Sequence, residues 1–287
     1  MKNNVILLGA PRSGTSLLTS LLHNPPDVIC LSEPRKIDAL TEQSSAPEEF
    51  VAGLVAFIAK IREDILRGTP IENRIDPHTG ALAENYAVRH EHSADGWVVE
   101  SGFQWQTQLL PIPESRFQLL VKRNAPLVAV IDRLVAREDI SVLAMLRDPV
   151  STILSWRSLD LPISRGHLHS AERISSELRI LVNEPDLLVR QVKILNWIFG
   201  RVMSHLSAHA IICYEDLMTD PDNAVAAIGF KISRPVSKLK SRNSSMYYDH
   251  SEAERVWQII ERHAPHILAF QNGRYARGKG RQVEQEA

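Results

Sequence analysis

Near its N-terminus the chain reads Val5-Ile6-Leu7-Leu8-Gly9-Ala10-Pro11-Arg12-Ser13-Gly14-Thr15-Ser16. The four leading residues form an unbroken apolar run that stops at glycine, which is typical of a parallel strand buried on both faces. A helix is expected from about Gly14 to Leu22, because Asn24, Pro25 and Pro26 then end the helical pattern. The chain therefore opens with a strand, a glycine-containing turn and a helix.

The turn after this strand has the spacing of a nucleotide-binding P-loop: Gly9, four residues, Gly14, and two more residues that end in the hydroxyl of Ser16. Thr15 stands where such loops have lysine, and Arg12 can supply the missing positive charge from within the loop. Backbone N–H groups and the helix dipole can surround an anion at a turn of this kind. An ordinary tight turn is the alternative, but the flanking strand and helix and Arg12 favour phosphate binding.

The same alternation of apolar runs and helical periodicity continues along the chain. Further strands are expected at residues 28–31, 97–100, 117–122, 141–146 and 210–213, and further helices at 47–67, 126–137, after Pro185, and from about Ser251 to about Phe270. Ser251 and Glu254 have the spacing of a capping box at the start of the last helix. Strands that alternate with helices pair in parallel through right-handed crossovers. The pattern predicts an α/β, P-loop-like three-layer fold with a central, mostly parallel sheet flanked by helices.

Composition argues against several kinds of partner. Lys and Arg total 33 against 34 Asp and Glu, so no overall field draws the protein to nucleic acid or to an acidic membrane. No apolar run approaches the roughly 20 residues of a membrane-spanning helix, and Gly9 and Pro11 interrupt the first run too early for a secretory signal. Cys30 and Cys213 lie far apart in apolar stretches, as free thiols do in a reducing compartment. These features predict a cytoplasmic protein without a membrane span.

A second basic residue, Arg147, follows the apolar run of residues 143–146. ATP-dependent kinases have an Asp at this kind of position. They neutralise the charge of the ATP phosphates with a loop lysine and with Mg²⁺, and the Mg²⁺ is held by a loop hydroxyl and by that Asp. Arg147 stands at this position here, and its positive charge is suited to binding a second phosphate group of the ligand. A sulfuryl group carries less charge than a phosphoryl group and can be transferred without a metal, so no metal is expected.

Together these residues resemble the sulfotransferase superfamily that uses 3′-phosphoadenosine 5′-phosphosulfate (PAPS). The 5′-phosphosulfate loop of that superfamily reads Pro-Arg/Lys-Ser-Gly-Thr-Thr/Ser, as residues 11–16 do here. Its members bind the 3′-phosphate with an arginine at a later strand end and a serine eight residues on, and Arg147 and Ser155 have that spacing. Asp148 and Pro149 are expected to cap and open the helix that carries Ser155. The resemblance implies PAPS as the donor and 3′,5′-diphosphoadenosine (PAP) as the product.

Two further segments resemble parts of this superfamily. Tyr214 begins a Tyr-Glu-Asp-Leu segment after a late strand, where the family's tyrosine can approach the adenine; a core tyrosine is the alternative. Arg277, Gly278 and Lys279 lie in a basic, glycine-containing segment that in the family closes over the 3′-phosphate; a disordered basic tail is the alternative.

The acceptor hydroxyl must lose its proton, which requires a general base within hydrogen-bonding reach. Cytosolic small-molecule sulfotransferases use a histidine where this chain has Asn124, and an amide cannot act as a base. Tyrosylprotein sulfotransferases and several carbohydrate sulfotransferases, which this chain resembles more closely in motif layout, use a glutamate that aligns with Glu33. Lys122 aligns with a lysine near their transferring sulfuryl group, and Lys122 and Arg12 would stabilise charge on the leaving oxygen. Alternatively, Glu33 is a structural acid that pairs with Arg35 or caps a helix.

The sequence thus predicts a sulfotransferase that acts on a hydroxyl of a small molecule or glycan, with a metabolite, glycan or lipid favoured over a protein. A P-loop kinase with an altered loop and a non-catalytic nucleotide-binding module are the alternatives. One domain is expected over residues 1–287. Residues 69–95 lack clear periodicity and are expected to be irregular, residues 37–95 are interpreted as an acceptor-binding insertion or lid, and residues 271–287 as a basic tail.

Two histidine pairs have a spacing that sometimes indicates a metal site. They are His90 with His92 and His167 with His169. Neither pair has a cysteine or an acidic cluster nearby in the sequence that would complete such a site. Both pairs are therefore interpreted as surface loop histidines.

Overall fold

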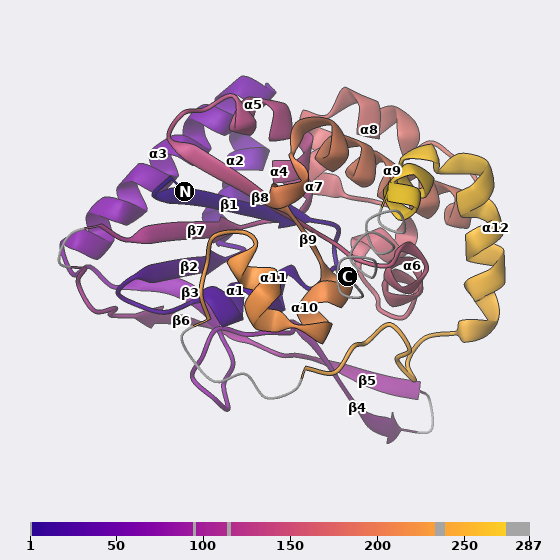
Figure 1. Ribbon diagram of the computed structural model, residues 1–287, viewed down its shortest axis with the longest axis horizontal. Coiled ribbons are helices and arrows are strands. Elements are labelled where there is room, and N and C mark those ends of the chain that lie inside the picture. Colours follow the sequence, from indigo (N-terminus) through magenta and orange to yellow (C-terminus); the bar gives the residue numbers. More distant parts are fainter. Residues whose placement is uncertain (1, 94–95, 114–115, 233–238, 274–287) are drawn as a thin grey trace, which may run out of the picture.

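The computed structural model describes residues 2–93, 96–113, 116–232 and 239–273, and its centre is a five-stranded sheet (Figure 1). The strands run in the order β2 (Val28–Ser32), β7 (Gln118–Lys122), β1 (Asn4–Gly9), β8 (Ile140–Leu146) and β9 (Ile211–Cys213). All neighbouring pairs are parallel. The carboxyl ends of the strands therefore meet at one edge, and the segments that follow them are brought together there.

Two apolar cores lie on the two faces of this sheet. Successive side chains of a strand point to opposite faces, so Ile6 and Leu8 of β1 join one buried cluster and Val5 and Leu7 join the other. Burying an aliphatic side chain of this size stabilises the fold by about 1.5–3 kcal/mol. Burial on both faces explains the continuous apolar run of β1.

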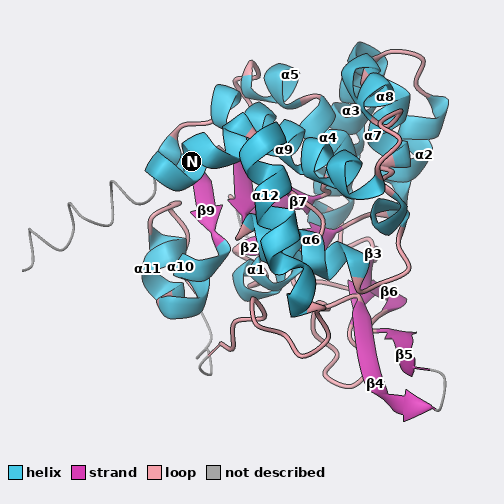
Figure 2. Ribbon diagram, turned by 90° about the vertical axis from the view of Figure 1, so that its right-hand side faces the viewer, coloured by secondary structure: helices cyan, strands magenta, loops and turns pink. Residues whose placement is uncertain are grey.

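Helices cover both faces of the sheet (Figure 2). One face is covered by α1 (Thr15–Leu22), α10 (Tyr214–Thr219) and α11 (Pro221–Ala226). The other face carries α2 (Arg35–Gln43), α3 (Pro47–Leu66), α4 (Ala125–Ala129), α5 (Ile131–Val135), α6 (Pro149–Arg157), α7 (His169–Ile174), α8 (Ser176–Leu181), α9 (Leu187–His205) and α12 (Ala253–His263). The predicted three-layer α/β fold is confirmed. The single helix expected at residues 126–137 is instead two short ones, because the backbone of Val130 leaves helical geometry (φ −117°, ψ 20°).

The expectation that residues 69–95 are irregular is wrong. They contain β3 (Ile71–Ile75), which pairs antiparallel with β6 (Gln104–Gln108), and β4 (Ala87–Ser93), which pairs antiparallel with β5 (Gly96–Ser101). The strand expected at 97–100 therefore belongs to a separate two-stranded ribbon and not to the central sheet. In β3 every second residue is buried, and the middle one of these is the polar Asn73, so the two isoleucines form no continuous apolar run.

Asn73 fastens the β3–β6 ribbon to the edge of the central sheet. Its side-chain amide donates to the carbonyl oxygen of Cys30 at 2.7 Å, and its Oδ1 accepts the backbone N–H of Ser32 at 3.0 Å. This buried side chain replaces the hydrogen bonds that a further strand would give to β2. The ribbon is thereby held beside the carboxyl end of β2.

The start of the last helix also differs from the prediction. Ser251 does not cap it: the Asp249 carboxylate accepts the backbone N–H of Ser251 at 3.1 Å and begins a 3-10 turn, η3 (His250–Glu252). Ser251 lies inside this turn, so the expected capping box with Glu254 does not form, and α12 begins only at Ala253. The helical pattern is interrupted at Ala264 before it continues past Phe270.

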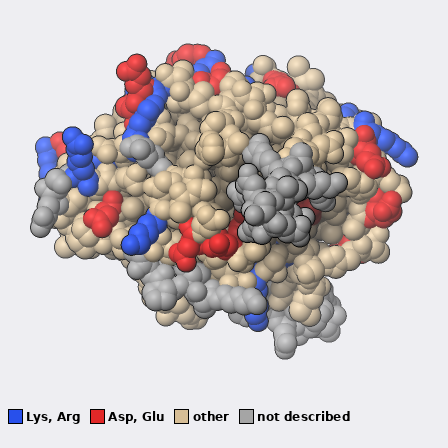
Figure 3. All heavy atoms as spheres, in the orientation of Figure 1, with Lys and Arg blue, Asp and Glu red and all other residues tan. Residues whose placement is uncertain are grey.

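Charged side chains are distributed over the visible surface as follows. On the face seen in Figure 3, the described basic side chains are interspersed with acidic ones and form no continuous basic patch. None of the helices in the described ranges has the length and apolar character needed to span a bilayer.

Candidate active site

The turn between β1 and α1 is packed tightly against its neighbours. A Cβ atom added to Gly9 would lie 2.4 Å from the carbonyl oxygen of Met145, and one added to Gly14 would lie 2.7 Å from the ring of Tyr214. Gly14 also has φ 95°, a left-handed conformation that favours glycine. Both glycines of the predicted loop are therefore required by the packing and the backbone.

This turn has the properties of an anion site. The first N–H groups of α1 have no acceptor within the helix. The N-cap residue is Gly14, which has no side chain that could accept a hydrogen bond from them. Ser13 is fully buried, yet its Oγ has no hydrogen-bond partner among the described residues. Thr15 donates its hydroxyl to Asn124 at 3.2 Å. A phosphate or phosphosulfate group would supply acceptors to this serine hydroxyl and to the free N–H groups, so the loop fits the 5′ end of the predicted donor.

Arg12, Arg147 and Ser155 lie at one place, although three separate segments carry them. Nη1 of Arg147 donates to the backbone carbonyl of Arg12 at 3.0 Å, and Nε of Arg12 donates to Oγ of Ser155 at 3.4 Å. Asp148 caps α6 as predicted, because its carboxylate accepts the N–H of Ser151 at 2.7 Å. The loop, the tip of β8 and the second turn of α6 therefore meet.

Arg147 is buried, and the hydrogen bonds of its guanidinium go to neutral groups. Apart from the Arg12 carbonyl, these are Oδ1 of Asn243 at 2.8 Å, the carbonyl oxygen of Arg242 at 2.8 Å and the hydroxyl of Tyr248 at 3.2 Å. No carboxylate in the described part of the chain forms an ion pair with it. A buried cation without a counter-charge is costly, and an anionic ligand would remove that cost.

Tyr248 and Asn243 are site residues that the sequence did not indicate. Burial raises the pKa of Tyr248, but the charge of Arg147 and hydrogen bonds with Ser155 and Arg147 outweigh burial, so the pKa is lowered overall. Both residues lie in a stretch with no recognisable motif, and their side chains reach Arg147 only in the folded chain.

Tyr214 lies between the loop and Arg147. Its ring packs on Gly14, the guanidinium carbon of Arg147 is 4.7 Å from its ring centroid, and its hydroxyl accepts the backbone N–H of Arg242 at 2.9 Å. This places Tyr214 at the site, and its contact with adenine stays a prediction. Arg277, Gly278 and Lys279 lie outside the described residues.

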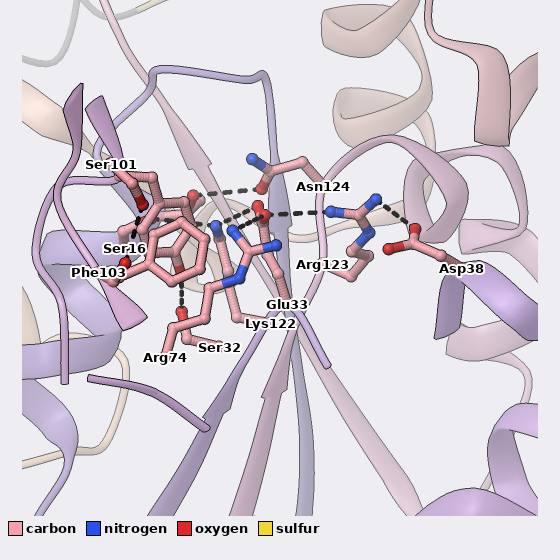
Figure 4. Close-up of polar contacts among 12 residues, drawn as sticks. Ser16, Ser32, Glu33, Asp38, Arg74, Ser101, Phe103, Lys122, Arg123 and Asn124 are labelled. Carbon is pink, nitrogen blue, oxygen red and sulfur yellow. Dashed lines mark hydrogen bonds and ion pairs between the residues drawn. The ribbon is translucent and has the colours of Figure 1, made fainter. Parts of the chain in front are cut away.

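Glu33 lies just beyond β2 and binds three cations (Figure 4). Its carboxylate is 2.5 Å from Nζ of Lys122, 3.0 Å from Nη1 of Arg74 and 3.1 Å from Nη1 of Arg123. Lys122 also donates to Oγ of Ser16 at 3.1 Å, which joins the carboxylate to the phosphate loop through one ammonium group. Glu33 thus lies beside the loop, as the alignment of motifs predicted.

Glu33 does not play the structural roles considered as alternatives. Arg35 pairs with Glu72 and not with Glu33, and Pro34, at the N-cap of α2, has no side-chain cap. Glu33 has φ 52° and Arg12 has φ 68°, and they are the non-glycine residues with positive φ among those described. Strained backbone of this kind is concentrated at functional sites.

The cations determine the protonation state of Glu33. Burial raises its pKa, but the charges of Lys122, Arg123 and Arg74 and the hydrogen bond from Lys122 lower it to about 2. The carboxylate is therefore ionised at neutral pH and able to accept a proton. It is a weak base while all three cations remain in contact, because a base is most effective when its pKa is near the working pH.

The guanidinium of Arg74 packs against three aromatic rings, those of Tyr86, Phe103 and Trp105, which we call the aromatic shelf. The guanidinium carbon of Arg74 lies 4.5, 4.4 and 5.0 Å from the three ring centroids. Tyr86 also lies under the ammonium group of Lys122, 4.9 Å from its ring centroid. Arg74 of β3 lies opposite Trp105 of β6. The sequence did not predict this pairing, because the two residues are far apart in the chain.

Comparison with known proteins agrees with this geometry. A search of curated proteins finds no match. A family model described as "Sulfotransferase family" matches residues 4–236, which include the loop, Glu33, Lys122, Arg147 and Tyr214 and more than half of the chain. The chain therefore belongs to the sulfotransferase family.

Proposed function

We propose that this protein transfers a sulfuryl group from PAPS to a hydroxyl of a small-molecule or glycan acceptor, with Glu33 as the general base. Membership of the sulfotransferase family supports sulfuryl transfer in general. The observation that carries the choice of donor is the buried Arg147, which has neutral partners and touches the loop through the Arg12 carbonyl. A nucleotide with phosphate groups at both its 3′ and 5′ positions would satisfy the two sites together.

The loop and Arg147 would bind opposite ends of the donor. The N–H groups of the loop, the Ser13 hydroxyl and Arg12 would hold the 5′ end. Four of the five N–H groups of Arg147 donate within the protein. A 3′-phosphate would take the remaining N–H and could replace the neutral acceptors Asn243 and Tyr248, while Ser155 donates its hydroxyl to the same group.

Lys122 connects donor binding to the base. PAPS supplies a sulfuryl group that is activated by its anhydride bond to phosphate. Lys122 and Arg12 would stabilise the negative charge that develops on the leaving oxygen. As Lys122 turns from Glu33 toward this oxygen, the carboxylate loses its shortest ion pair, and its pKa rises from about 2 toward the range of an effective base. Glu33 would then accept the proton of the acceptor hydroxyl.

The aromatic shelf gives the acceptor a surface beside Glu33. Aromatic rings bind the faces of sugars and other rings through dispersion and stacking. We therefore assign acceptor binding to the aromatic shelf and the β3–β6 ribbon. Tyr86 and β3 lie within the predicted insertion at residues 37–95, whereas β6 lies after it. The two cysteines of the chain, buried Cys30 and half-buried Cys213, form no disulfide with each other, which supports a location in the reducing cytoplasm.

A thermal-shift comparison of PAP, ATP with Mg²⁺ and 5′-AMP tests the donor. A ligand at 100 times its dissociation constant adds about 2.7 kcal/mol of stability, and we expect PAP to produce the largest shift without Mg²⁺. Stabilisation by ATP with Mg²⁺ but not by PAP would contradict the proposal. Transfer of labelled sulfate from PAPS to a panel of hydroxyl acceptors then separates an enzyme from a module that only binds the nucleotide.

A further inference from the structure

A histidine pair interpreted from the sequence as surface loop residues is part of a three-residue cluster. One nitrogen each from His167 and His169 and one carboxylate oxygen of Glu172 lie within 4.8 Å of one another. His169 is the first residue of α7 rather than a loop residue, and Glu172 follows it by one helical turn. The structure therefore supplies the acidic group that the sequence seemed to lack.

The backbone around the cluster is firmly held. The 3-10 turn η1 (Pro162–Arg165) ends at Gly166 with φ 73°, and a Cβ there would lie 2.5 Å from Cδ of Arg190. The N–H of His167 donates to the carbonyl of Pro162 at 3.0 Å. The Glu172 carboxylate accepts the N–H of Leu168 at 2.5 Å, which holds it beside the two histidines.

The distances between the three ligand atoms are close to those around a small transition-metal ion, and the two imidazole rings, which are stacked with centroids 5.1 Å apart, would turn so that both nitrogens face the ion. Nδ1 of His167 is 3.3 Å from Oε1 of Glu172, and Nδ1 of His169 is 3.7 Å from Oε2. With zinc–ligand bonds of about 2.0–2.1 Å, tetrahedral ligand atoms lie about 3.3 Å apart. Two imidazoles and one carboxylate are a ligand set for zinc and similar ions, whereas Mg²⁺ and Ca²⁺ prefer oxygen alone.

Solvent can reach the cluster. The side chains of His167 and His169 are 34% and 64% exposed, against 15% for Glu172. Both histidines also line a surface cavity with Asp160, Leu161 and Arg165. An ion bound by the three side chains could therefore complete its coordination with water from the cavity.

We propose that His167, His169 and Glu172 bind one divalent transition-metal ion of the zinc type. The site lies apart from the donor loop and does not depend on the proposed function. It would join the turn after η1 to α7, which packs against α2 and α4 (Figure 1). Those two helices begin just after Glu33 and Asn124, so a metal here would strengthen the support behind the candidate active site.

The test uses the full chain without a histidine tag, stripped with a chelator and then dialysed against Zn²⁺. We expect one zinc per chain by elemental analysis and a higher melting temperature that the chelator reverses. Co²⁺ in place of zinc should give visible ligand-field absorption.

Two variants and one control make the assignment specific. His169→Ala and Glu172→Gln should each weaken zinc binding at least about tenfold, because removing a ligand costs more than removing a group that only orients one. Glu172→Gln keeps an acceptor for the Leu168 N–H, so its melting temperature in chelator should match that of the wild type. His209→Ala, at an exposed histidine elsewhere, should leave zinc binding unchanged.

Three results would overturn the proposal. They are the absence of bound zinc in the wild type, equal affinity in the wild type and His169→Ala, and loss of binding only in a His90→Ala/His92→Ala variant. In each case the cluster would be a set of histidine–glutamate contacts that fixes the start of α7.

Discussion

Replacement of Arg147 by methionine separates recognition of the 3′-phosphate from support of the loop. Methionine has a similar length but no charge and no N–H donors. Arg147 as a residue is 5% exposed, and its guanidinium donates four hydrogen bonds of 2.8–3.2 Å. If a 3′-phosphate is the counter-ion of this buried charge, the variant loses the main contact to that group while the 5′ site remains.

The expected loss can be estimated from the burial of the pair. Removing one partner of a buried ion pair costs about 3–5 kcal/mol, and 1.4 kcal/mol corresponds to a tenfold change, so PAP should bind roughly 100- to 5,000-fold more weakly. 5′-AMP has no 3′-phosphate and would lose only the support that Arg147 gives to the loop through the Arg12 carbonyl, so its affinity should fall by about 2- to 10-fold, the value of one hydrogen bond. Arg147→Lys keeps the charge but loses the planar fork of donors, so its affinity for PAP should be intermediate.

Isothermal titration of PAP and 5′-AMP into each variant, with melting temperatures to confirm folding, gives the comparison. Equal weakening of both ligands would refute the assignment. It would show that Arg147 acts by holding the Arg12 carbonyl, and hence the loop, rather than by binding the 3′-phosphate.

Other substitutions test the remaining parts of the site. Glu33→Gln should abolish sulfate transfer in a turnover assay and leave PAP affinity largely intact; loss of both would indicate that Glu33 supports the fold. Because folding lowers the pKa of Glu33 from its ordinary 4.5 to about 2, its ionised form stabilises the protein above pH 4.5, and this contribution is lost as the pH falls toward 2. Urea unfolding between pH 6 and pH 3 should therefore show a larger fall in stability for the wild type than for Glu33→Gln, and parallel curves would contradict the assigned pKa. Once the 3′-phosphate has replaced Tyr248 as an acceptor of Arg147, the Tyr248 hydroxyl can donate to that phosphate; Tyr248→Phe should therefore weaken PAP binding by about 2- to 10-fold, the value of one hydrogen bond, and should not affect 5′-AMP in the same titration. Gly14→Ala should abolish PAP binding and lower the melting temperature, because its Cβ would lie 2.7 Å from the ring of Tyr214 at φ 95°; normal PAP binding would show that the loop tolerates a side chain.

Features that depend on neighbouring residues were predictable from the sequence. The apolar run before Gly9 predicts a buried parallel strand, and the spacing of Gly9, Gly14 and Ser16 predicts an anion-binding turn after it. The position of Arg147 also follows, because parallel strands end at one edge of the sheet and thereby bring strand-tip residues together. Glu33 and Lys122 were located by the same rule together with the family resemblance.

Features made by contacts between distant segments were decided only by the tertiary structure. No local pattern indicates that Asn73 fastens a ribbon to β2, that Arg74 joins Lys122 at Glu33, or that Tyr248 reaches Arg147. A half-buried strand has no continuous apolar run and is therefore hard to recognise in the sequence. The hydrogen-bond partner of a polar side chain can be identified only in the folded structure when the two residues are far apart in the chain. The sequence by itself indicated the segments that form the five strands of the central sheet and the residues at their ends, but it did not separate them from the strand at residues 97–100, which lies in a ribbon. The folded chain determined the charges around Glu33, and therefore its pKa, because electrostatic interactions depend on distance in space and not on separation along the chain.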